Sequence, residues 1–144
     1  MDSASILIKP VIDKWLQDAK KYLKKDGYLA PMLLVKFTNN QVMSIALTDL
    51  VQTNDFQLKR LYFTTVGNKL RDKHGEIDEA VMIVEGWYVR GGTLNVLPSK
   101  HPLRQEAICI IGRNASKTRV TSVIQPFVRG KNKQPLWKKV QTGF

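Results

Sequence analysis

The sequence predicts an α+β fold in which two helices pack on one face of a mostly antiparallel sheet of five to six strands. Two observations lead to this class. Apolar residues recur at helical spacing in two separate segments. The other apolar residues form short runs joined by brief polar turns, as in antiparallel strands. The expected order is helix, strand, strand, helix, three strands and a short fourth, in a single domain over residues 1–144.

The first helix is expected at residues 9–25. Trp15 and Leu16 belong to an apolar stripe with helical spacing on either side of them. Pro10 suits the first turn, and Gly27 suits the position after the last. Four lysines favour the end of the helix through its dipole, namely Lys20, Lys21, Lys24 and Lys25.

A hairpin is expected next, with strands at residues 32–37 and 42–47 around a polar turn. The second helix is expected to begin near Asn54, where Asn54 and Gln57 can cap it, and to end before Gly75. Three strands follow at 79–90, 105–113 and 118–129, with a short fourth at 136–140. Pro126 places the third of these at a sheet edge or a bulge, because proline cannot donate a ladder hydrogen bond.

Charge is concentrated in the last third of the chain. The protein has 23 basic and 12 acidic residues, a net charge of +11, and after residue 99 there is one acid, Glu106, against ten basic residues. This imbalance indicates nucleic acid or another polyanion as a partner, or a device for solubility. Phe127 and Trp137 add rings on which bases could stack. The alternative is that the lysines protect an edge strand from aggregation. The expected contact residues are Lys117, Arg119, Arg129, Lys131, Lys133, Trp137, Lys138 and Lys139.

Several kinds of chemistry have no signature in the sequence. Cys109 is the one cysteine and lies in an apolar strand, so we expect an inert thiol and no disulfide. There is no glycine-rich phosphate loop or histidine pair at short spacing, so we expect no cofactor and no metal. No segment is long and apolar enough to be a signal peptide or to span a bilayer. We therefore expect a cytoplasmic protein with no membrane partner.

One set of polar residues attracts attention because it interrupts an apolar strand. Glu85 lies in a row of apolar side chains, where an unpaired carboxylate would be costly to bury. Glu106 opens the next strand, and His101 lies in the loop between them. If the sheet brings the two acids together, an arginine partner or a raised pKa is implied. A solvated sheet face or a structural ion pair is the alternative. The candidate polar cluster is Glu85, Trp87, His101, Arg104 and Glu106.

Residues 84–89 (VEGWYV), 98–107 (PSKHPLRQEA) and 111–113 (IGR) carry a resemblance. This part of the chain resembles a set of small uncharacterised prokaryotic proteins, in which a strand ending Glu-Ala-Trp precedes a Pro-Ser-x-x-Pro-x-Arg-x-Glu-Ala loop and a strand ending Gly-Arg. The chain departs from the pattern at Gly86, where the pattern has alanine. The resemblance implies no activity or ligand. It implies one structural unit containing Glu85, Trp87, Pro102, Arg104 and Glu106, with Arg104 paired to one of the two acids.

Three functions stay open at this point. The first is a binding or accessory protein that contacts a polyanion without sequence specificity. The second is a structural or assembly protein that forms homo-oligomers through a sheet edge or the first helix. The third is an enzyme with a site at Glu85, Glu106 and His101, for which the sequence offers no known catalytic spacing.

Overall fold

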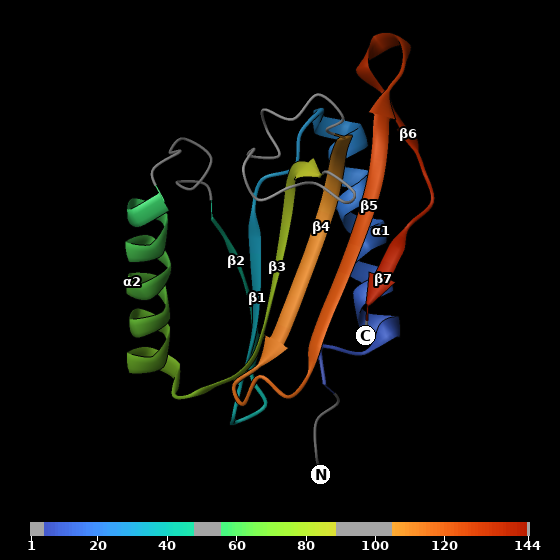
Figure 1. Cartoon of the computed structure of the whole chain (residues 1–144). Helices are drawn as coiled ribbons and strands as arrows, with labels where there is room; N and C mark the ends of the chain where they lie inside the picture. Colours follow the sequence, from blue (N-terminus) through green and yellow to red (C-terminus); the bar gives the residue numbers. More distant parts are fainter. Residues whose placement is uncertain (1–4, 48–55, 89–104, 144) are drawn as a thin grey trace.

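Figure 1 shows the computed structural model of the chain, which describes residues 5–47, 56–88 and 105–143. In chain order the elements are α1 (Lys9–Asp26), β1 (Met32–Phe37), β2 (Val42–Ala46), α2 (Phe56–His74), β3 (Ile77–Tyr88), β4 (Gln105–Asn114), β5 (Val120–Arg129), the 3-10 turn η3 (Lys131–Lys133), β6 (Pro135–Trp137) and β7 (Gln141–Gly143). The α+β class and the predicted order of helices and strands are confirmed. The cap predicted at Asn54 lies outside the described residues.

The strands form an antiparallel sheet in the order β2-β1-β3-β4-β5-β6, and β7 also pairs with β5. The sheet has seven strands where five to six were expected, because the C-terminal segment contributes two short strands. β6 pairs with residues 127–129 of β5 and β7 pairs with residues 122–124. Pro126 lies between these two pairings, so β5 tolerates its missing N–H without being an edge strand. Its carbonyl accepts a hydrogen bond from the Lys138 N–H at 2.9 Å.

Helix α1 ends one residue later than predicted, with the expected terminal signals. Pro10 occupies the first turn. Gly27 follows the helix in the left-handed conformation (φ 79°), and its N–H donates to the Leu23 carbonyl at 2.8 Å. A residue with a Cβ would be strained there, so glycine ends the helix cleanly.

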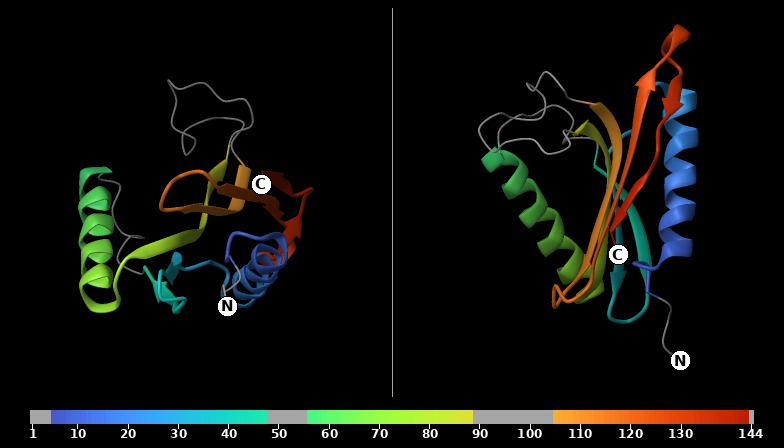
Figure 2. Two further views of the ribbon diagram at one scale, coloured as in Figure 1. Left: turned by 90° about the horizontal axis from the view of Figure 1, so that it is seen from below. Right: turned by 45° about the vertical axis from the view of Figure 1, so that its right-hand side comes forward.

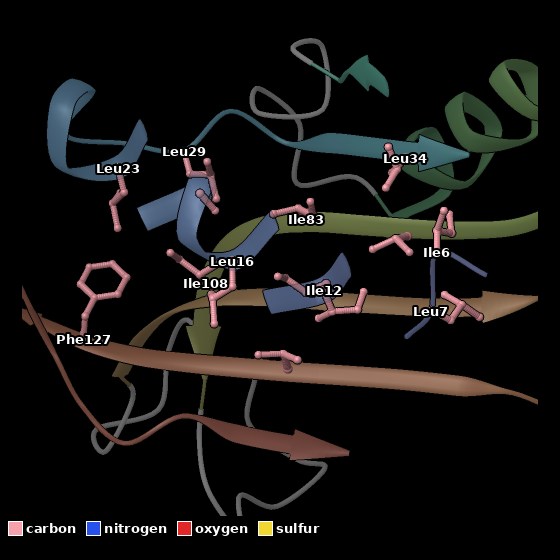
Figure 3. Packing of buried hydrophobic residues seen from close by; sticks show 14 residues of the cluster. Ile6, Leu7, Ile12, Leu16, Leu23, Leu29, Leu34, Ile83, Ile108 and Phe127 are labelled. Carbon is pink, nitrogen blue, oxygen red and sulfur yellow. The ribbon is translucent and has the colours of Figure 1, made fainter. Parts of the chain in front are cut away.

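The buried side of α1 packs on one face of the sheet, which we call the α1 face (Figure 2). Alternate residues of β3, β4 and β5 point to this face and form the main core with the helix. Ten side chains of this core are labelled in Figure 3. Its fully buried strand residues are Val81, Ile83, Ile108, Ile110, Val123 and Phe127.

Helix α2 stands beside the β1–β2 end of the sheet, away from α1 (Figures 1 and 2). His74 at its C-terminal end contacts the ring of Phe37, with 5.2 Å between ring centroids, on the face opposite α1. The two helices are therefore further apart than the expected packing on one shared face of the sheet would place them. Leu61 of α2 is 62% exposed, so this apolar side chain does not anchor the helix to the sheet.

Candidate polyanion interface

Arg129 is the last residue of β5 and lies between two carboxylates. In Figure 1 this end of β5 is at the top. The Nη2 of Arg129 donates to Glu85 Oε1 at 2.9 Å, and its Nε donates to Glu106 Oε2 at 3.0 Å. The pairing register of β3, β4 and β5 explains why these three side chains meet. Glu106 stands opposite Trp87 on one side and Phe127 on the other, so Glu85 and Arg129 are its diagonal neighbours on the α1 face. The three side chains are 21–27% exposed.

Glu85 also fixes the segment that connects α1 to β1. Its second oxygen, Oε2, accepts a hydrogen bond from the Leu29 N–H at 2.9 Å, and the Leu29 side chain is buried in the core. The cluster therefore joins the α1–β1 connection, β3, β4 and the end of β5. We call Glu85, Glu106 and Arg129 the brace.

The brace answers the question that the polar residues raised in the sequence. The two acids do come together, and Arg129 pairs with both of them. Arg104 and His101 lie outside the described residues. Trp87 lies in β3 opposite Glu106, while its side chain is outside the described part. Both carboxylates accept hydrogen bonds from the guanidinium, which cannot act as a base, so this arrangement gives no support to acid–base catalysis.

Lys20 connects α1 with the C-terminal segment, and both of these parts of the chain carry further lysines. The ammonium of Lys20 in α1 lies over the ring of Trp137 in β6, with Nζ 5.1 Å from the ring centroid. This contact places the last turns of α1 beside β6. The views in Figure 1 and Figure 2 agree with this placement. Lys24 stands one turn after Lys20 on the same side of the helix. We define the basic end as Lys20, Lys24, Lys131, Lys138 and Lys139.

Sequence reasoning located only part of this group. Lys131, Lys138 and Lys139 are exposed, as expected for contact residues. Lys133 lies in η3, and its side chain is outside the described residues. Lys20 and Lys24 were missed, because their position at the end of α1 was explained by the helix dipole alone. The density of lysines between residues 20 and 25 was the signal that could have identified them.

Other predicted contact residues lie elsewhere or are engaged by the protein. Lys117 and Arg119 lie in the β4–β5 turn, at the opposite end of β5 from η3 (Figure 1). Arg129 is part of the brace. Trp137 is half-buried, contacts Lys20 and packs edge-on against Phe127 with 5.6 Å between ring centroids. Phe127 is 1% exposed, so its ring is enclosed in the core and cannot receive a base.

A second ionic cluster lies at the lower end of the sheet. Lys36 is buried, with its Nζ 3.5 Å from Asp78 Oδ2 and 3.8 Å from Glu79 Oε1. Glu79 also accepts hydrogen bonds from the Ile6 N–H at 2.9 Å and from the Ser5 hydroxyl. This cluster therefore holds the segment that leads into α1.

Burial raises the pKa of the Cys109 thiol above its ordinary value, which is the behaviour expected of an unreactive thiol. Within residues 5–47, 56–88 and 105–143, no three His, Cys, Asp or Glu side chains gather in a way that could hold a metal ion. No helix in this described part is long and apolar enough to cross a membrane.

Comparison of the chain with protein-family models, with curated proteins and with solved structures finds no match. The functional interpretation accordingly depends on the geometry of the molecule itself.

Proposed function

We propose that this chain is a cytoplasmic binding protein that holds a polyanion, a nucleic acid or another phosphate-rich chain, on its basic end. The contact between Lys20 and the Trp137 ring carries the proposal. It joins two lysine-bearing segments that are far apart in the sequence, the last turns of α1 and the segment around β6. Together they present a local excess of positive charge, which attracts and holds phosphate groups.

The chemistry of the basic end favours binding without sequence specificity. All five of its residues are lysines, whose ammonium groups act as point charges and lack the planar fork with which arginine reads a base or a phosphate. Arg129 ends β5 two residues before Lys131, and its guanidinium donates to two carboxylates. Affinity should therefore depend on the number of phosphates neutralised and decrease steeply with salt.

Fluorescence anisotropy with a labelled single-stranded oligonucleotide tests the proposal. The variant Lys24→Gln/Lys131→Gln/Lys138→Gln removes three exposed charges from the basic end. We expect it to bind about tenfold or more weakly at moderate salt, and the slope of log affinity against log salt to decrease by about 2, as the loss of three phosphate contacts requires.

The matched control removes three charges from the opposite end of the sheet, Arg113→Gln/Lys117→Gln/Arg119→Gln. Both variants have the same net charge, so a difference between them reports position rather than total charge. Equal weakening by the two variants, or no binding of the wild-type chain at low salt, would refute the proposal.

Self-association is a second candidate function, favoured by a separate observation. Val128 of β5 and Leu136 of β6 stand opposite each other and are both exposed on the face of the sheet opposite α1. Exposed apolar side chains on neighbouring strands are typical of interaction surfaces. Sedimentation of the wild-type chain and of Val128→Lys/Leu136→Lys tests this candidate. A dimer that the double substitution dissociates supports it, and a monomeric wild-type chain at high concentration contradicts it.

A further inference from the structure

We infer that the polyanion is a single-stranded nucleic acid and that one of its bases stacks on Tyr28. This inference rests on the proposed function and adds the class of ligand. Charge alone does not distinguish a nucleic acid from any other phosphate chain. An exposed aromatic ring beside the charges does distinguish them, because a nucleobase gains stacking energy on such a ring and a phosphate does not.

Tyr28 has the exposure that a stacking platform needs. Its side chain is 62% exposed, and it directly follows the helical turn that carries Lys24 and Lys25. Within the described part of the chain its ring packs against no other aromatic ring. A base could therefore approach it while adjacent phosphates reach the lysines.

The backbone on both sides of Tyr28 is fixed. The Gly27 N–H donates to the Leu23 carbonyl at 2.8 Å, and the Leu29 N–H donates to Glu85 of the brace at 2.9 Å. The Leu29 side chain already fills the core at this point. The backbone at Tyr28 is thus held between two anchored residues, which lowers the backbone entropy lost when a ligand binds to its ring.

The brace also connects the segment of Tyr28 with the segment that carries Lys131. Glu85 accepts from the residue after Tyr28 and from Arg129, which ends the strand leading to Lys131. The stacking ring and the η3 lysine therefore belong to segments attached to the same carboxylate.

Phe127 and Trp137 are the rings that the sequence suggested for base stacking, but both make contacts within the protein. Phe127 is enclosed in the core, and Trp137 lies between Lys20 and Phe127. Tyr22 is exposed too, at 50%, but it lies inside α1, with Asp18 and Asp26 one helical turn before and after it. Tyr28 lies beyond the end of the helix, with Asp26 as its one acidic neighbour within four residues along the chain, so we expect stacking on Tyr28 rather than on Tyr22.

The experiment compares two labelled ligands of equal length, oligothymidylate and an abasic oligomer with the same phosphates and no bases. We expect the wild-type chain to bind oligothymidylate about tenfold more tightly than the abasic oligomer, as one stacked base predicts. Tyr28→Leu should abolish this difference and leave abasic binding unchanged. Tyr28→Phe, which keeps the ring, and Tyr22→Leu, the matched control, should both retain it.

Each other outcome has a definite meaning. Equal wild-type affinity for the two ligands overturns the inference and leaves the proposed function intact, because the phosphates are still bound. Equal weakening of both ligands by Tyr28→Leu also overturns it, since that result indicates a general structural effect. Failure of both ligands to bind at low salt overturns the inference and the proposed function together.

Discussion

Arg129 shows how one residue can connect several elements of the molecule. It donates to Glu85 and Glu106, and Glu85 in turn accepts from the Leu29 backbone. The two acids are therefore not equivalent. Removal of Glu106 costs its hydrogen bond from Arg129, whereas removal of Glu85 costs its own hydrogen bond from Arg129 and also leaves the Leu29 N–H without its carboxylate.

This asymmetry predicts the stability of two alanine variants. Glu85→Ala should lower the free energy of unfolding by about 2–3 kcal/mol, and Glu106→Ala by about 1 kcal/mol, because hydrogen bonds to charged groups are worth about 1.5–3 kcal/mol and these are partly exposed. Urea denaturation followed by circular dichroism measures both values. An equal loss for the two variants would contradict the role assigned to Leu29.

Cys109 allows a prediction on reactivity and pH. Its pKa is raised by burial, so at a given pH it holds less thiolate than a free cysteine, and the thiolate is the reactive form. Reaction with a disulfide reagent at neutral pH should be slower than with free cysteine, and should accelerate on unfolding in urea. Fast reaction of the native protein would show an accessible thiol.

The raised pKa of Cys109 also has a consequence for stability. A folded-state value above the unfolded one means that the native protein disfavours the thiolate. The contribution of Cys109 to stability is therefore fully present below the unfolded pKa and is lost as the pH rises through the folded pKa. Cys109→Ser should show a smaller decrease of stability at alkaline pH.

At the scale of elements, α1 is attached to β3 at both of its ends. Glu79 accepts from the Ile6 N–H before the helix, and Glu85 accepts from the Leu29 N–H after it. Both glutamates point to the α1 face, since they are six residues apart on one strand. Between these two contacts the apolar side of the helix packs on the core.

The close approach of the segment before α1 to β4 yields a prediction. A Cβ at Gly112 would lie 2.7 Å from Leu7 Cδ2 and 2.9 Å from Val81 Cγ2, two buried side chains. Gly112→Ala should therefore lower the free energy of unfolding by about 1–3 kcal/mol through overpacking. Thermal or urea denaturation measures the change.

Gly86 is the matched control for this prediction. Among the described residues, and apart from Gly86 itself and its two chain neighbours, no heavy atom would lie within 4 Å of a Cβ there. Glycine inside a strand is also unfavourable. Gly86→Ala should leave stability unchanged or raise it slightly. A comparable loss in both variants would show that strand glycines matter here for a reason other than contact with Leu7.

At the scale of the whole molecule, the positive charge is separated into different regions. The basic end gathers lysines from α1 and the β6 region, whereas Lys117 and Arg119 occupy the far end of β5. Like charges held close together repel one another and lower stability until a polyanion neutralises them. Binding and stability should therefore be linked.

This linkage predicts an effect on thermal unfolding. A short oligothymidylate at about 100 times its Kd should stabilise the wild-type chain by about 2.7 kcal/mol, which raises its Tm by about 5–10 °C. The Lys24→Gln/Lys131→Gln/Lys138→Gln variant should show a clearly smaller shift under the same conditions. Equal shifts in scanning calorimetry would place the binding surface elsewhere.

The sequence by itself determined the local features of this protein. The helical period and the Pro10 and Gly27 signals predicted α1 within one residue, and alternation with polar turns predicted the antiparallel strands. These features depend on residues close together in the chain, whose conformational preferences act locally. They indicated that Glu85 would be costly to bury without a partner and suggested Arg104 for one of the two acids, but they did not indicate Arg129.

Only the tertiary structure decided which distant residues meet. The register of β3, β4 and β5 places Arg129 beside Glu85 and Glu106, and a shift of one residue would turn these side chains to the other face. The packing of α1 across the sheet places Lys20 on Trp137. Such contacts join segments with many intervening residues, and they follow from how the whole core packs rather than from any local pattern.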